Sequence, residues 1–126
     1  MVKSSKGALA RRKGHDWERE LVRTLQERGF NAERVITETK HGNIGDVVVW
    51  DVGLLVQCKA GKQPNLARAL DEAEQAADNR DSQWAPLGGW MAIGACKKSL
   101  NPTTASRRVS MDLEDFLHLL ELAYPT

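Results

Sequence analysis

An acid, an amide and a lysine stand along two neighbouring apolar runs of this 126-residue chain. Asp46 begins the first run, and ten residues separate it from the Gln57-Cys58-Lys59 segment that ends the second. Such runs predict buried strands, in which polar groups need partners or a function. Carboxylate and amide oxygens bind hard cations such as Mg²⁺, and a lysine beside them can orient water or offset charge. These residues suit metal-assisted hydrolysis of a phosphodiester bond.

The register of the predicted hairpin decides whether these side chains share a face of the sheet. Gln57 and Lys59 are two residues apart, so their side chains point to the same face, and Cys58 points away. A two-residue turn places Asp46 opposite Gln57 or Lys59, on their face. A three-residue turn over residues 51–53 places Asp46 opposite Cys58, unless a bulge restores the shared face. The sequence leaves these alternatives open.

The first predicted helix, residues 14–28, adds a second acid. Glu18 is followed by apolar Leu21 and Val22 at i+3 and i+4, so it lies at the edge of the buried face, whereas Glu20 takes the other side. A carboxylate on the buried face needs a cation, which is either an arginine in a structural salt bridge or a metal. The candidate metal ligands are Asp46, Gln57, Glu18 and the backbone carbonyl of Cys58.

The remaining elements must position these residues. The pattern predicts a strand at 30–36, a polar loop at 37–44, the hairpin at 45–59, a helix from Pro64 to about residue 79, strands at 90–97 and 107–111, and a final helix capped by Asp112. This order predicts an α/β fold in which helices flank a mixed β-sheet in a single domain. We expect the domain to span residues 13–126 and to follow a flexible basic arm over residues 1–12.

Composition limits the class of protein. With 41% hydrophobic residues, 28% charged residues and a net charge of +1, the chain can bury a core and stay in solution. Its basic start leads into a polar helix, and no apolar run is long enough to span a bilayer. We therefore expect no membrane association and a cytoplasmic location, in the host cell if the protein is viral. Cys58 and Cys96 fit no zinc or disulfide pattern, so we expect free thiols.

The spacing from Asp46 to Gln57-Cys58-Lys59 resembles the motif of the PD-(D/E)xK nucleases. The first helix strengthens this resemblance, because Lys13-Gly14, the segment from Glu18 to Leu21, and Gly29-Phe30 are similar to the opening of the archaeal-type Holliday junction resolvases. The resemblance covers about residues 11–80, more than half of the chain. It implies a restriction-endonuclease-like fold.

The resemblance also implies an activity and a site. Such enzymes are homodimers that bind four-way DNA junctions and cut two strands symmetrically with Mg²⁺, which Mn²⁺ could replace. Glu18 matches the helix acid of the family, Asp46 its metal-binding aspartate and Lys59 its catalytic lysine. Gln57 stands where the family usually has glutamate, so the site lacks one negative charge. We expect activity to remain, and the catalytic set to be Glu18, Asp46, Gln57 and Lys59.

Basic residues outside this cluster are candidates for contacts with DNA. They would bind phosphates, which position DNA without reading its bases. The primary candidates are Lys6, Arg11, Arg12, Lys13, Lys40, His41, Lys62 and Arg68, and further ones are Lys97, Lys98, Arg107 and Arg108.

Three alternatives remain on the sequence alone. The first is a nuclease of the same fold that cuts flaps, nicks or restriction-type sites. The second is a catalytically impaired junction-binding protein, because Gln57 replaces an acid. The third is an α/β protein whose polar cluster is only a structural salt bridge.

Overall fold

The computed structural model describes residues 6–35, 45–80, 85–99 and 104–125, and only the backbone of residues 6–13. Within them the elements are α1 (Lys6–Glu27), β1 (Ala32–Arg34), β2 (Val47–Val49), β3 (Leu54–Gly61), α2 (Leu66–Asn79), β4 (Met91–Ser99), β5 (Ala105–Met111) and α3 (Leu113–Ala123). None of these helices is both long enough and apolar enough to cross a membrane.

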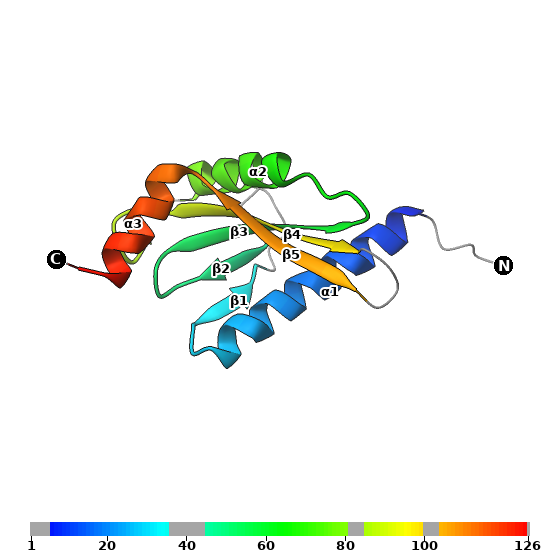
Figure 1. Cartoon of the computed structure of the whole chain (residues 1–126), viewed down its shortest axis with the longest axis horizontal. Helices are drawn as coiled ribbons and strands as arrows, with labels where there is room; N and C mark the ends of the chain where they lie inside the picture. Colours follow the sequence, from blue (N-terminus) through cyan, green and yellow to red (C-terminus); the bar gives the residue numbers. More distant parts are fainter. Residues whose placement is uncertain (1–5, 36–44, 81–84, 100–103, 126) are drawn as a thin grey trace.

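In the described part of the chain the strands form one five-stranded sheet in the order β1-β2-β3-β4-β5 (Figure 1). β3 and β4 are parallel, and the other neighbouring strands are antiparallel. A parallel pair needs a crossover connection, which α2 supplies. The predicted α/β fold with a mixed sheet and flanking helices in a single domain is therefore confirmed.

The two long helices cover opposite faces of the sheet (Figure 1). On the α1 face, Trp17 packs in a buried cluster with Val56 and Cys58 of the hairpin. On the α2 face, Leu55 packs against Ala76. Because side chains alternate along β3, Gln57 and Lys59 belong to the α2 face.

α2 lies unusually close to β4. Its inward residues Ala69, Ala73 and Ala76 are fully buried. A Cβ added at Gly94 of β4 would lie 2.6 Å from the backbone nitrogen of Leu70, so only glycine fits there. This close packing fixes the first turn of α2 over the middle of β3 and β4, where Gly94 pairs with Gln57.

Several predicted boundaries were wrong. α1 begins at Lys6 and not at residue 14, because the preceding segment is rich in strong helix formers, and it crosses the expected boundary between arm and domain. The predicted strand 30–36 shortens to β1. α2 begins at Leu66 after the N-cap Asn65, whose side chain accepts a hydrogen bond from the Arg68 N–H, and not at Pro64. The predicted loop 37–44 lies outside the described residues.

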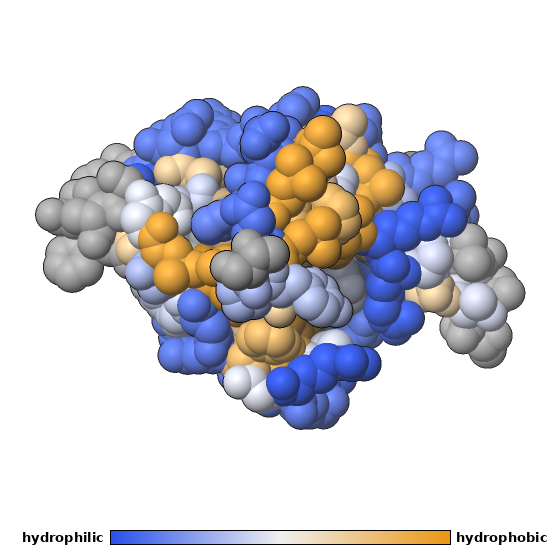
Figure 2. Space-filling model, turned by 60° about the vertical axis from the view of Figure 1, so that its left-hand side comes forward, coloured by the Kyte–Doolittle hydropathy of each residue, from blue (hydrophilic) through white to orange (hydrophobic). Residues whose placement is uncertain are grey.

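Helix α3 is capped by Asp112, as predicted, and leaves large apolar side chains exposed. The side chains that are at least 40% exposed are Leu113, Phe116, Leu117, Leu120, Leu122 and Tyr124. Figure 2 looks toward the end of the molecule that carries α3 and shows apolar side chains gathered there. A cavity of about 400 Å³ separates Leu119 and Leu122 of α3 from Phe30 and Leu54. We call this exposed side of α3 the α3 apolar surface.

Candidate active site

The β2–β3 hairpin selects one of the predicted registers. Val47 pairs with Val56, which is the register that places Asp46 opposite Gln57. The Asp46 N–H, however, donates to the carbonyl of Val56 at 2.9 Å, so Asp46 is displaced along the ladder as in a β-bulge. Gly45 precedes it with a φ of 95°, a conformation that glycine adopts readily. The hairpin therefore combines a predicted register with a bend directly before Asp46.

The carboxylate of Asp46 binds the edge of β3. Its Oδ2 accepts a hydrogen bond from the backbone N–H of Cys58 at 2.8 Å. β2 begins only at Val47. Beside Cys58, the Asp46 carboxylate therefore accepts the hydrogen bond from β3 that the backbone of a neighbouring strand would otherwise accept. Asp46 therefore meets the other site residues where the pairing of β2 with β3 ends, and not on one shared face as the register alone predicts.

Glu18 approaches Asp46 from the α1 face. The residue is 9% exposed, and its Oε2 lies 3.1 Å from Nη2 of Arg34 on β1. The predicted arginine partner is therefore present, but it does not isolate Glu18 from Asp46.

Burial raises the pKa of Asp46 to about 6. The hydrogen bond from the Cys58 N–H opposes this rise, the neighbouring Glu18 adds to it, and the positive charge of Lys59 opposes it. A proton or a cation between the two carboxylates would relieve their repulsion. The Asp46 carboxylate thus accepts a hydrogen bond, but the positive charges around it do not fully offset its negative charge.

Lys59 reaches the same region from the α2 face, where it forms an ion pair with Glu72. Its Nζ lies 2.6 Å from Oε2 of Glu72 on α2, and Oε1 of Glu72 lies 3.4 Å from Nε of the exposed Arg68. Sequence reasoning missed Glu72. Its position four residues after Arg68, beside the buried stripe of α2, was the available signal. A cavity of about 320 Å³ opens here, lined by Lys59, Ala60, Gln63, Pro64, Asn65 and Arg68.

Gln57 has a buried amide oxygen that lacks a hydrogen-bond partner among the described residues. Buried polar atoms are nearly always satisfied, so this oxygen is a candidate ligand. Mg²⁺ binds oxygen atoms and typically takes one or two carboxylates, which matches Asp46, Glu18 and Gln57. No three His, Cys, Asp or Glu side chains of the described residues form a metal site, so other oxygen atoms, such as that of the Gln57 amide, would have to complete the ligand set of a cation here. The donor set fits Mg²⁺ on this basis.

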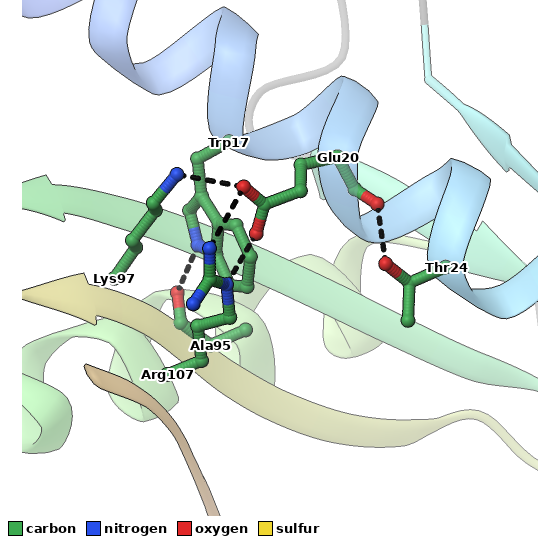
Figure 3. A network of polar contacts seen from close by, with 6 residues as sticks. All are labelled: Trp17, Glu20, Thr24, Ala95, Lys97 and Arg107. Carbon is green, nitrogen blue, oxygen red and sulfur yellow. Dashed lines mark hydrogen bonds and ion pairs between the residues drawn. The ribbon is translucent and has the colours of Figure 1, made fainter. Parts of the chain in front are cut away.

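A separate polar network joins α1 to β4 and β5 (Figure 3). Glu20 accepts hydrogen bonds from Nζ of Lys97 at 2.7 Å and from the guanidinium of Arg107. The bond from Arg107 is the main cause that lowers the pKa of Glu20 to about 2. Two of the further DNA-binding candidates, Lys97 and Arg107, are therefore held in ion pairs with Glu20, which periodicity alone had placed on the solvent side.

The other basic candidates lie in different parts of the chain. Lys62 is exposed just after β3, and Arg68 borders the cavity beside Lys59. Lys6, Arg11, Arg12 and Lys13 lie on the first turns of α1, and Lys40 and His41 lie outside the described residues.

A mixed sheet whose central hairpin brings acids and a lysine together suits an α/β nuclease. Residues 9–75 match the family model of the archaeal Holliday junction resolvase (Hjc), and the chain belongs to this family. The predicted resemblance and the restriction-endonuclease-like fold are thereby confirmed. The chain is a resolvase nuclease, a hydrolase that acts on DNA, of a family that serves DNA recombination and repair. No curated protein matches the chain.

The family match covers one part of the fold. It includes most of α1, the hairpin and most of α2, and with them Glu18, Asp46, Gln57 and Lys59. β4, β5 and α3 follow the matched residues. The family match therefore does not extend to those elements.

Proposed function

We propose that this enzyme resolves four-way DNA junctions by metal-dependent hydrolysis, with paired symmetric cuts made by a homodimer. One observation carries the proposal. Asp46 is held at the edge of β3 between Glu18 and Lys59, and its pKa is raised to about 6 although it accepts a backbone hydrogen bond. Nucleases of this family are generally metal-dependent, and a divalent cation is the partner that such a cluster favours.

Asp46, Gln57 and Glu18 would hold Mg²⁺, or Mn²⁺ in its place, and the Cys58 carbonyl remains a further candidate ligand. When bound, the cation would polarise the scissile phosphate and offset the charge that develops on it. Arg34 keeps Glu18 oriented through their ion pair. Gln57 supplies an oxygen without charge, so we expect a higher magnesium requirement than a glutamate would give.

Lys59 acts on the substrate side of the site. The ion pair with Glu72 fixes its ammonium group at the cavity that Arg68 also borders. An ammonium there can orient the attacking water or stabilise charge on the phosphate, whereas deprotonation would require a strongly lowered pKa. We therefore assign Lys59 a positioning and electrostatic role. Lys62, Arg68 and the basic start of α1 would hold the flanking phosphates.

The α3 apolar surface is our candidate for the homodimer contact. Paired cuts need two active sites, and each chain contains one. Exposed apolar patches of this kind mark interaction surfaces, and a second copy carries the same patch in a self-complementary form. Leu117→Glu combined with Leu120→Glu should convert a dimer into a monomer in sedimentation velocity. Val109→Glu on β5, where the valine is 65% exposed, is the matched control and should leave the dimer intact.

The test of the proposed function uses labelled four-way junction and a duplex of the same sequence, each with and without Mg²⁺. Paired cuts in the junction, dependent on the metal, are the expected result. Cutting of flaps or nicks in preference to the junction would replace the proposed substrate. Binding without cutting would leave a junction-binding protein and contradict the proposed hydrolysis.

A further inference from the structure

A second basic pocket lies on the α2 face, beside the cavity that contains Lys59. It has a volume of about 210 Å³ and is lined by Gln63, Pro64, Leu66, Cys96, Lys98, Ser106 and Arg108. Its polar groups are mainly two cations and a hydroxyl group. We call it the β4–β5 pocket. Its basic residues lie outside the family match, so membership of the family does not assign it a role.

Three elements hold the pocket in shape. Lys98 on β4 pairs with Ser106 on β5, so both side chains lie on the same face, and Arg108 follows on that face two residues after Ser106. The Ser110 hydroxyl donates to the Leu66 carbonyl at 2.9 Å and ties β5 to the first turn of α2. Lys98 and Arg108 therefore lie on paired strands of the sheet and not in a loop.

Among the described residues, no acid pairs with the cations of the pocket. On the α1 face of the same two strands, Lys97 and Arg107 both pair with Glu20. On the α2 face, Lys98 and Arg108 make no ion pair with any described residue, and the buried hydroxyl oxygen of Ser106 has no hydrogen-bond partner there. Two free cations beside an unsatisfied hydroxyl suit an anion with several acceptor oxygens, as a phosphate has.

The position of the pocket indicates which phosphate it would bind. Cys96 of β4 pairs with Lys59 on one side and with Arg108 on the other, so Arg108 lies two strands from Lys59. That separation is roughly 10 Å at the usual spacing of strands. The two cavities also share Gln63 and Pro64 in their walls. A strand with one phosphate at Lys59 can thus place a neighbouring phosphate in the pocket.

We infer that the β4–β5 pocket binds a backbone phosphate of the DNA, close to the phosphate that is cut. The inference rests on the proposed function, because it takes DNA as the ligand. Ser106 would donate to a phosphate oxygen, and Lys98 and Arg108 would neutralise its charge. The contact would fix the strand relative to Lys59 without reading a base.

The experiment compares Lys98→Gln/Arg108→Gln with Arg23→Gln/Arg28→Gln, which removes the same charge from one exposed position on α1 and one directly after it. Junction binding is measured without Mg²⁺ over a series of salt concentrations. We expect the pocket variant to bind at least about tenfold more weakly and to reduce the slope of log K against log salt by about one for each phosphate that the protein no longer neutralises. The α1 variant should keep the wild-type affinity and slope.

Ser106→Ala is a second, milder variant that keeps the charges and should still weaken binding a few-fold. Equal affinity and slope in the pocket variant, the α1 variant and the wild type would overturn the inference and leave the proposed function standing. A wild-type enzyme that binds no junction would overturn both.

Inorganic phosphate distinguishes DNA from a free anion as the ligand. Followed through the amide resonances of Ser106 and Arg108, it should bind only weakly to the wild-type enzyme and be displaced by junction DNA. Tight binding of inorganic phosphate that junction DNA does not displace would overturn the inference in favour of a free-anion site.

Discussion

Two acidic residues of α1, only two positions apart, lie in clusters of opposite electrostatic character. Glu20 is matched by Lys97 and Arg107, and its pKa is lowered to about 2. Glu18 faces Asp46, and the pKa of Asp46 is raised to about 6 despite a hydrogen bond from the backbone. The first cluster is complete within the chain. In the second, binding of a proton or a cation would relieve the repulsion between the two carboxylates.

This difference sets opposite pH dependences of folding stability. The contribution of Glu20 is fully present above its ordinary pKa of 4.5 and is lost as the pH falls toward about 2. The contribution of Asp46 is present below its ordinary pKa of 3.8 and is lost as the pH rises through about 6. At neutral pH the Glu20 cluster therefore stabilises the fold, whereas the ionised Asp46 costs stability, as functional sites commonly do.

Asp46→Asn should have the largest effect on activity. We expect the rate of junction cutting to fall by at least about 10³-fold, because a charged metal ligand is removed, while junction binding without metal is kept. Single-turnover cutting and a binding titration measure the two quantities. Glu20→Gln, which changes the acid that pairs with Lys97 and Arg107, is the matched control and should cut at the wild-type rate. A wild-type rate in Asp46→Asn would refute the assignment of the site.

Gln57→Glu should sharpen the contrast by supplying the charge that the site lacks. The apparent affinity for Mg²⁺ should rise by about tenfold, read as the metal concentration that gives half-maximal cutting. Gln75→Glu, on the exposed side of α2, makes the same change away from the site and should leave that concentration unaltered. An unchanged requirement in Gln57→Glu would show that residue 57 does not bind the metal.

Glu20→Gln should lower the free energy of unfolding by about 1–2 kcal/mol at pH 7, since two partly buried ion pairs are weakened. The difference from the wild type should shrink as the pH falls below 4.5 toward 2, where Glu20 becomes protonated. Chemical denaturation at pH 7 and pH 3 measures both differences. Glu27→Gln, at the exposed end of α1, is the control. A decrease of equal size at both pH values would contradict the lowered pKa.

The sequence predicted that the residues of the candidate site lie near one another, but it did not predict how they are arranged. The spacing from Asp46 to Lys59 carries both the hairpin and the chemistry, because strand periodicity is local. The Cys58 N–H as the partner of Asp46 could not be foreseen, since it follows from the bend after Gly45 and from the late start of β2. The register was one of the predicted alternatives, but it did not determine where the carboxylate points.

Contacts between distant elements were the least predictable part. Glu72 reaches Lys59 only because α2 packs closely over Gly94. Glu20 meets residues 77 and 87 positions away, so helical periodicity could only place it on the side away from Glu18. Both ion pairs depend on how helices cross the sheet, which local patterns do not encode.

The most direct test of the metal site is the thermal unfolding of the DNA-free enzyme over a magnesium titration. A ligand that binds only the folded state raises Tm, so the wild-type Tm should rise by roughly 5 °C near saturation. Glu20→Gln should start from a lower Tm and show the same rise. Asp46→Asn should show none. A rise in Asp46→Asn equal to that of the wild type would contradict the claim that Asp46 and its neighbours form the cation site.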